Sequence, residues 1–186
     1  MKKYLSLALL TFTLLLLSSS CAWAQKSNNA SSNSSDNALR KEIEGIKELL
    51  VKHYDPMIPI ANYKPFVKAR FEPIDFNSCN LRYKLIAPLD KNSSYILDVN
   101  MNLADLDPDN VIVSKDLKRE NRWFISLQTL NMAQKIKVKY STVTGTKVSN
   151  SGSFDPPVTG FDADGQDNAQ TIADAFTSVI KQCSQK

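Results

Sequence analysis

Cysteine placement sets the first limit on this fold, because two of the three cysteines, Cys79 and Cys183, lie far beyond an apolar N-terminal segment. A bridge between them would close a loop of about 100 residues, worth about 4–5 kcal/mol in the chain-entropy model. Beyond the apolar N-terminal segment the chain has two cysteines, and an even number in an exported protein favours a disulfide. Two buried free thiols are the alternative. We predict a bridge that ties the first half of the domain to its last helix. Paired in this way, neither thiol would serve as a nucleophile.

The N-terminus has the parts of a secretory signal. Lys2 and Lys3 precede an apolar stretch from Leu5 to Leu17, and the small-x-small sequence 22–24 follows. This stretch is shorter than the roughly 20 residues that a membrane-spanning helix needs. We therefore expect residues 1–24 to be a cleaved signal peptide, and the mature protein to be exported to the periplasm, the outer surface or the medium.

Cys21 offers an alternative to simple cleavage, since lipoprotein signals place an acylated cysteine near this point. Ser18 stands where such a signal needs an aliphatic residue, so cleavage after Ala24 is favoured over lipidation at Cys21. The Ser/Asn-rich composition of residues 25–37 predicts a flexible tether, which lipoproteins also carry. Membrane attachment is expected only through this lipid anchor.

The charge pattern gives no sign of a nucleic-acid partner. Removal of residues 1–24 leaves 21 basic against 19 acidic residues, a net charge of +2, with both signs interspersed. Lys135, Lys137 and Lys139 alternate along one side of an expected strand. Such lysines are typical of a solvent-facing strand that avoids edge aggregation.

Hydrophobic periodicity divides the remaining chain into a helical segment, 38–55, and a single β-rich domain, 56–186. The first helix is predicted over residues 37–53 and stops at Pro56. Period-two alternation then predicts short antiparallel strands. These are expected at 66–71, 80–87, 95–103, 111–113, 123–127 and 136–140, with a further candidate at 142–148.

The chain ends in the strongest helical stripe of the sequence. Asp167 or Asn168 is expected to cap this helix, and Cys183 shares its apolar face with Phe176, seven residues earlier. The same acidic stretch includes Asp162 and Asp164, which we expect to complement the helix dipole.

The sequence resembles an uncharacterised class of exported bacterial domains across residues 66–183. The matching stretches are Phe76-x-x-Cys79-x-Leu81, the turn 102–108, Val111-x-Val113, Leu127-x-Thr129, and Ala169-x-x-Ile172-Ala173-x-Ala175-Phe176 ending in Cys183. Several strands followed by one closing helix is also the order of the pleckstrin-homology-like barrel. The resemblance implies a fold and no chemistry, and residues 75–78 lack the basic loop of phosphoinositide-binding members.

We therefore expect an α+β fold that is mainly β. An antiparallel bent sheet or a small barrel of the pleckstrin-homology type would be closed by the C-terminal amphipathic helix, with an extra helix at the N-terminus.

Catalytic and metal sites have little support in the sequence, and no cofactor is expected. His53 is the only histidine, and its place at a helix end is typical of a capping or packing role. Asp105, Asp107, Asp109 and Asp116 follow part of the calcium-loop spacing. Asn110 replaces the required glycine, and Asp116 the bidentate glutamate, so an ordinary type I turn at 107–110 between two strands is favoured.

The sequence has clear helix and strand patterns but no catalytic motif. This favours a non-enzymatic binding or adaptor module of the cell envelope or the extracellular space. Its partner would be an unidentified protein or small ligand, and its oligomeric state is open. The alternative is a carrier that holds a small apolar ligand between sheet and helix. A hydrolase that uses a pair of carboxylates is the least favoured hypothesis, because the acids cluster at turns and helix ends.

Overall fold

The computed structural model describes residues 36–60 and 66–185. Strands account for 49% of the structure, and an N-terminal and a C-terminal helix pack on antiparallel sheets, which confirms the expected α+β class. The residues from Leu39 onward form one compact unit. In the described ranges, no helix is both long and apolar enough to cross a membrane.

The N-terminal helix covers residues 36–53. Its apolar positions recur at three- and four-residue steps, and this places Leu39, Ile43, Ile46 and Leu50 in the core with 4% or less of each exposed. The chain leaves the helix at Tyr54, which makes an isolated antiparallel bridge to Ala163.

Five strands form the larger antiparallel sheet, in the order β3-β4-β5-β8-β9. Their bounds are β3 Arg70–Asp75, β4 Asn80–Pro88, β5 Ser93–Asn102, β8 Lys137–Thr144 and β9 Lys147–Phe154. Along β4, Leu81, Tyr83 and Leu85 are buried between more exposed neighbours, as the period-two pattern predicts.

The sequence pattern predicts a further strand at 142–148, but this segment is not a separate strand. It holds the end of β8, the turn at Gly145 and the start of β9, so the two strands form a hairpin. Gly145 has a φ of 58°, and glycine adopts this left-handed conformation without a steric cost.

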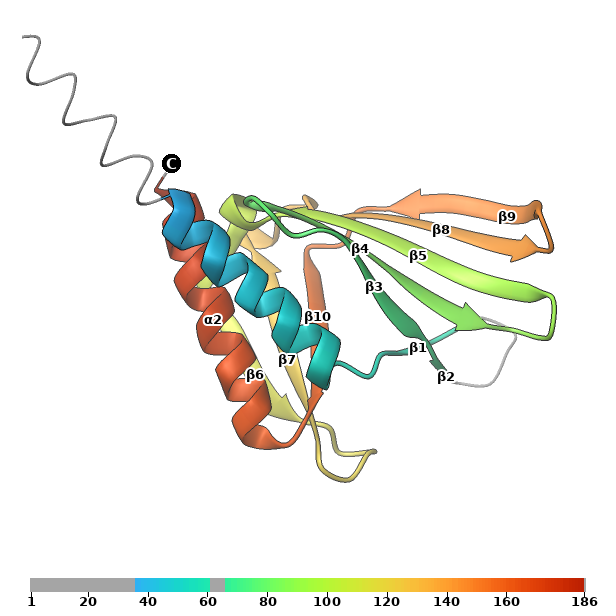
Figure 1. The fold of residues 1–186 in the computed structure, drawn as a ribbon, viewed down its shortest axis with the longest axis horizontal. Coiled ribbons are helices and arrows are strands. Elements are labelled where there is room, and N and C mark those ends of the chain that lie inside the picture. The colour runs from blue at the N-terminus through green and yellow to red at the C-terminus, as the bar shows by residue number, and fades with distance from the viewer. Residues whose placement is uncertain (1–35, 61–65, 186) are drawn as a thin grey trace, which may run out of the picture. The chain divides into compact units, whose positions relative to one another are not determined.

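Three strands form the second sheet, in the order β10-β7-β6. They are β6 Leu106–Lys115, β7 Arg122–Thr129 and β10 Val158–Asp164, and a short pair, β1 Met57–Ile58 and β2 Val67–Lys68, stands apart. Two short 3-10 helices, η1 Leu103–Asp105 and η2 Leu130–Met132, follow β5 and β7. Figure 1 shows β6, β7 and β10 beside the two helices, while β8 and β9 extend away from them.

The expected turn at 107–110 lies inside β6. This strand pairs with β7 at Leu106 and again from Val111, and the register shifts between those two positions. Asp107 fixes the irregular stretch, since its carboxylate accepts hydrogen bonds from the Asp109 backbone N–H (3.0 Å) and the Asn110 side chain (2.6 Å). The residues therefore form a bulge rather than a connection between two strands.

Helix α2, Gln166–Ser184, packs on the second sheet and on η1. Its predicted inner stripe is buried, and the ring of Phe176 stacks on that of Phe161 in β10, with 5.3 Å between centroids. The cap differs from the prediction: Gly165 is the N-cap residue, without a side-chain hydrogen bond, whereas the Asn168 amide donates to the Asp164 carbonyl oxygen at 2.7 Å.

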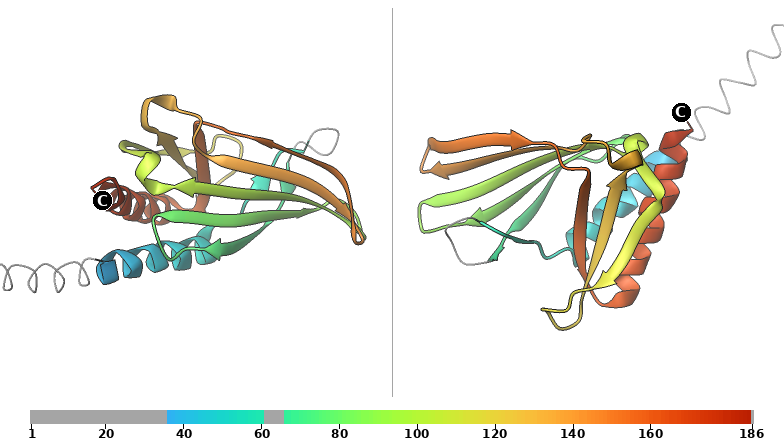
Figure 2. Two further views of the ribbon diagram at one scale, coloured as in Figure 1. Left: turned by 90° about the horizontal axis from the view of Figure 1, so that it is seen from above. Right: turned by 180° about the vertical axis from the view of Figure 1, so that it is seen from behind.

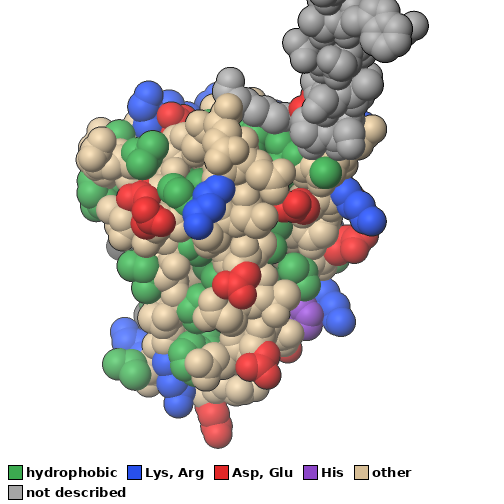
Figure 3. All heavy atoms as spheres, turned by 90° about the vertical axis from the view of Figure 1, so that its left-hand side faces the viewer, with side chains coloured by type: hydrophobic (Ala, Val, Ile, Leu, Met, Phe, Trp, Pro, Cys, Tyr) green, Lys and Arg blue, Asp and Glu red, His purple; other side chains and the backbone are tan. Residues whose placement is uncertain are grey.

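The two helices lie side by side on the same side of the sheets (Figure 2). The Glu42 carboxylate accepts hydrogen bonds from Ser178 (2.9 Å) and Gln182 (2.8 Å) of α2. Charged side chains of both signs are scattered over the face seen in Figure 3, and its hydrophobic side chains form small, separate groups. This pattern is typical of an ordinary solvated surface.

A disulfide joins Cys79 to Cys183, as the sequence predicts. The Cα atoms are 5.8 Å apart, inside the usual range for such bridges. Cys79 precedes β4 and Cys183 lies in the last turn of α2, so the bond connects the larger sheet to the C-terminal helix.

Candidate binding groove

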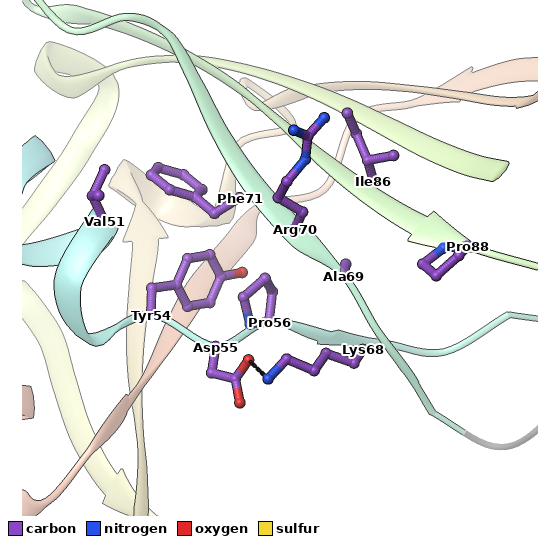
Figure 4. A pocket seen from close by; sticks show the side chains of 10 residues that line it. All are labelled: Val51, Tyr54, Asp55, Pro56, Lys68, Ala69, Arg70, Phe71, Ile86 and Pro88. Atoms are coloured by element: carbon purple, nitrogen blue, oxygen red, sulfur yellow. Dashed lines mark ion pairs between the residues drawn. The ribbon is translucent and has the colours of Figure 1, made fainter.

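A groove of about 440 Å3 opens where the N-terminal helix ends beside the larger sheet (Figure 4). We call it the helix-end groove. Three segments far apart in the sequence line it: Val51, Tyr54, Asp55 and Pro56 at the helix end, Lys68, Ala69, Arg70 and Phe71 across β2 and β3, and Ile86 and Pro88 in β4.

Aromatic rings set the position of the groove's inner wall. Tyr54 meets Phe71 edge-on at 5.4 Å and Phe161 edge-on at 5.1 Å between ring centroids. Phe71 in turn contacts Tyr83 of β4 at 5.4 Å. Edge-to-face contacts of this kind favour one relative orientation of the rings, so this wall is held by the core behind it.

The Tyr54 hydroxyl is the polar group of this wall. Burial, followed by the neighbouring Tyr83, raises the pKa of Tyr54 well above its usual value, so the phenol stays protonated at neutral pH. Among the described residues this hydroxyl has no hydrogen-bond partner, and it is not fully enclosed. Figure 4 shows its hydroxyl end turned toward the other lining side chains. A ligand in the groove would find a neutral donor here.

The groove's rim carries two cations in exposed ion pairs. Lys68 contacts Asp55 at 2.8 Å and Arg70 contacts Glu72 at 3.0 Å, and both basic side chains are 72% exposed. Exposed pairs contribute only about 0–1 kcal/mol, so either cation can exchange its carboxylate for one on a ligand.

A partly buried ionic cluster fixes the helix end from behind. Asp162 of β10 is 5% exposed and pairs with Arg119 at 2.5 Å and Arg122 at 3.0 Å. Arg122 also donates to the Asp55 carbonyl oxygen at 3.2 Å, which ties the chain beyond the helix to the second sheet. Burial alone would lower the pKa of Arg119, but hydrogen bonds to Asp116 and Asp162 leave it above its usual value.

This cluster gives Asp162 a role that the sequence pattern does not predict, since its carboxylate pairs with two arginines. Asp164 contacts His53 Nδ1 at 3.0 Å. Burial opposes the shift, but the hydrogen bond from His53 and nearby charges hold the pKa of Asp164 below its usual value. The described contacts of His53 include no hydroxyl or thiol, so they form no nucleophile–base pair.

The weak calcium candidate is not assembled. Asp105 lies in η1, Asp107 accepts hydrogen bonds within the β6 bulge, and Asp116 pairs with Arg119 at 2.6 Å. Within the described ranges, no three His, Cys, Asp or Glu side chains meet in a metal-binding arrangement, and this includes Asp109.

Sequence reasoning did not identify the helix-end groove. The sequence pattern predicts only a helix over 37–53 and a strand over 66–71, and nothing in it marks Tyr54, Arg70 or Phe71 as lining a groove. The sequence Tyr54-Asp55-Pro56, a large aromatic residue at a helix stop, is the one local signal that could have pointed there. Cys21, the signal sequence 1–24 and residues 25–35 of the tether lie outside the described residues, and residues 36–37 belong to the N-terminal helix.

Comparison with protein-family models, with curated proteins and with solved structures finds no match to this chain.

Proposed function

We propose that the protein is an exported, non-enzymatic binding module that holds a segment of a partner protein in the helix-end groove. The observation that carries the proposal is the open, apolar groove wall with the Tyr54 hydroxyl, which has no hydrogen-bond partner among the described residues. An apolar side chain of the partner would lie among Val51, Tyr54 and Phe71, and a backbone carbonyl or carboxylate would accept from Tyr54. Lys68 and Arg70 at the rim favour an acidic residue beside that side chain.

An open groove favours a segment of a larger partner over a small apolar ligand carried inside the fold. On α2, Ile172, Phe176, Val179 and Ile180 are all 0% exposed, so side chains already occupy the interior between helix and sheet. The helix-end groove lies outside this packed region and has room for a side chain that approaches from solvent.

Export is supported by the N-terminal signal pattern and by the Cys79–Cys183 bond. Fractionation of producing cells tests it. We expect the protein outside the cytoplasm with its N-terminus at Gln25, and a Cys21→Ala variant should be processed at the same site. A protein found reduced and full-length in the cytoplasm would contradict the proposal.

Selection from a library of displayed random peptides tests binding in the groove. The selected peptides should share one large apolar residue next to an acidic one. Val51 is 60% exposed, so a Val51→Glu variant should fold normally and yet bind these peptides about tenfold or more weakly, because a carboxylate would enter the apolar contact.

Val148 provides a matched control, because it is 62% exposed and lies on β9 rather than in this groove. A Val148→Glu variant should keep the wild-type affinity in the same fluorescence-anisotropy assay. Tyr54→Phe should weaken binding by a few-fold, as expected for one hydrogen bond. Equal affinity of Val51→Glu and Val148→Glu for the selected peptides would exclude the helix-end groove as their site.

A further inference from the structure

A second groove, of about 520 Å3, lies on the face of the larger sheet that points away from its buried rows. Strand register places its side chains in two adjacent cross-strand rows. One row holds Lys84, Asp98, Lys139 and Ser153, and the other holds Ile96, Ser141 and Ser151. We call this surface the sheet groove, and none of these residues belongs to the helix-end groove.

Two lysines in the sheet groove form no ion pair with any residue that the structure describes. Lys84 on β4 and Lys139 on β8 are the cross-strand neighbours of Asp98 on β5. The Asp98 carboxylate, however, accepts two hydrogen bonds from Arg82, of 2.9 and 2.7 Å. The Arg82 hydrogen bond outweighs the opposing effect of burial and holds the pKa of Asp98 below its usual value. Among the described residues, no carboxylate lies within 4.0 Å of either lysine ammonium.

The surrounding hairpin strengthens the positive field. From Lys137 to Phe154, β8 and β9 carry three lysines and no acidic residue, and of these lysines Lys137 pairs with Asp155, directly after β9. Solvation alone would account for lysines on a flat strand, but here Lys139 borders a concave surface beside three serine hydroxyls. The chemistry therefore suits a ligand that is both anionic and rich in hydroxyl groups.

We propose that the sheet groove binds an acidic polysaccharide whose sugar units carry carboxylates. Lys84 and Lys139 lie two strand spacings apart, about 10 Å, a distance that consecutive sugar units can span. Their ammonium groups would pair with sugar carboxylates, while Ser141, Ser151 and Ser153 exchange hydrogen bonds with ring hydroxyls.

Asp98 discriminates between a glycan and an acidic peptide. Its ionised carboxylate only accepts hydrogen bonds, and sugar hydroxyls can donate to it. The side chains of an acidic peptide such as hexaglutamate carry only carboxylate acceptors and offer Asp98 no hydroxyl donor. Ile96 and Val148 add a small apolar contact for the sugar ring.

Titration calorimetry at low salt with the disulfide-bonded mature protein tests the proposal. The probes are a hexamer of galacturonic acid, its methyl-esterified form without charge, and hexaglutamate. We expect the acidic hexamer to bind, with an affinity that falls as salt rises, and both other probes to bind far more weakly. A Lys84→Gln/Lys139→Gln variant should lose about tenfold in affinity, which two exposed charge contacts together supply.

A Lys118→Gln/Lys181→Gln variant is the control, because it removes the same charge from the β6–β7 connection and from α2. It should bind the acidic hexamer as the wild type does. An equal loss in both variants would show a non-specific charge effect and overturn the site. Hexaglutamate binding as tightly as the sugar would overturn the glycan assignment, and absence of hexamer binding would overturn the proposal altogether.

Discussion

At the scale of single residues, buried polar groups of opposite kinds define the region behind the helix-end groove. The Asp162 carboxylate pairs with two arginines, whereas Tyr83 is a neutral phenol, 1% exposed, whose hydroxyl lies 3.5 Å from Thr159 Oγ1. Removing the carboxylate would leave Arg122 without an ion pair among the described residues, whereas Arg119 would keep Asp116, and a largely buried charge needs its partner. The neutral phenol needs no charged partner, but its ionised form would be a buried charge without one. Alkaline pH should therefore destabilise the folded protein at this residue.

Tyr83 should therefore make stability fall at high pH. Burial, which the Thr159 hydrogen bond opposes only partly, raises the pKa of Tyr83 from 10.0 to about 12. Between these values the unfolded chain binds fewer protons than the folded one, so the free energy of unfolding falls by up to about 1.4 kcal/mol per pH unit. Tyr83→Phe should flatten this decline in urea unfolding curves measured from pH 8 to pH 11.5.

The pH 8 measurement is the internal control, because Tyr83 is protonated there in both the folded and the unfolded chain. Any difference between wild type and Tyr83→Phe at this pH reports the hydroxyl contact alone. The raised pKa of Tyr54 leaves a residual alkaline loss in the variant, with the same sign. Parallel pH profiles for the two proteins would show that Tyr83 does not couple ionisation to folding.

At the scale of elements, α2 stabilises the fold mainly through the one apolar face that its sequence periodicity predicts. Phe176 is 0% exposed and contacts Phe161, whereas Phe154 at the end of β9 is 49% exposed. Phe176→Ala should lower the free energy of unfolding by about 3–5 kcal/mol, through lost transfer energy and the cavity that remains. Phe154→Ala makes the same chemical change at a half-exposed position and should cost about 1 kcal/mol or less. Similar losses in chemical denaturation would contradict the packing of α2.

Elements were predictable where their signal is local. The helix stripes and the alternation along β4 follow from burial of one face, and they appear where expected. Along β5 only Val99 and Met101 are buried, and residues 93–98 are all half-buried. β10 was missed because Gly160 and its aspartates hide the strand pattern, and only Arg119 and Arg122 make a buried Asp162 tolerable. The helix-end groove could not be predicted from the sequence for a related reason. Three segments far apart in the sequence form it, and they come together only when the strands pair.

At the scale of the whole molecule, one covalent bond spans most of the fold. Between Cys79 and Cys183 lie all strands from β4 to β10 and nearly all of α2, with a sequence separation of 104. In the chain-entropy model, the stabilisation by a disulfide grows with the length of the loop that it closes. The bond lowers the conformational entropy of the unfolded chain, whereas the folded chain is already ordered. The second sheet contacts α2 directly, and the larger sheet is joined to it by the disulfide. Breaking this bond should therefore lower the stability of the whole domain.

Reduction of this bond should therefore lower the free energy of unfolding by about 4 kcal/mol, with a corresponding fall in the urea midpoint. The wild-type protein is unfolded in urea with and without reductant, next to a Cys79→Ala/Cys183→Ala variant. The variant should unfold near the reduced wild type in both conditions, apart from a smaller loss due to the missing sulfur of Cys183, which is 3% exposed. A reductant effect of the same size in the variant would assign the change to the reagent. Identical midpoints for oxidised and reduced wild type would mean that the bond does not restrain the unfolded chain.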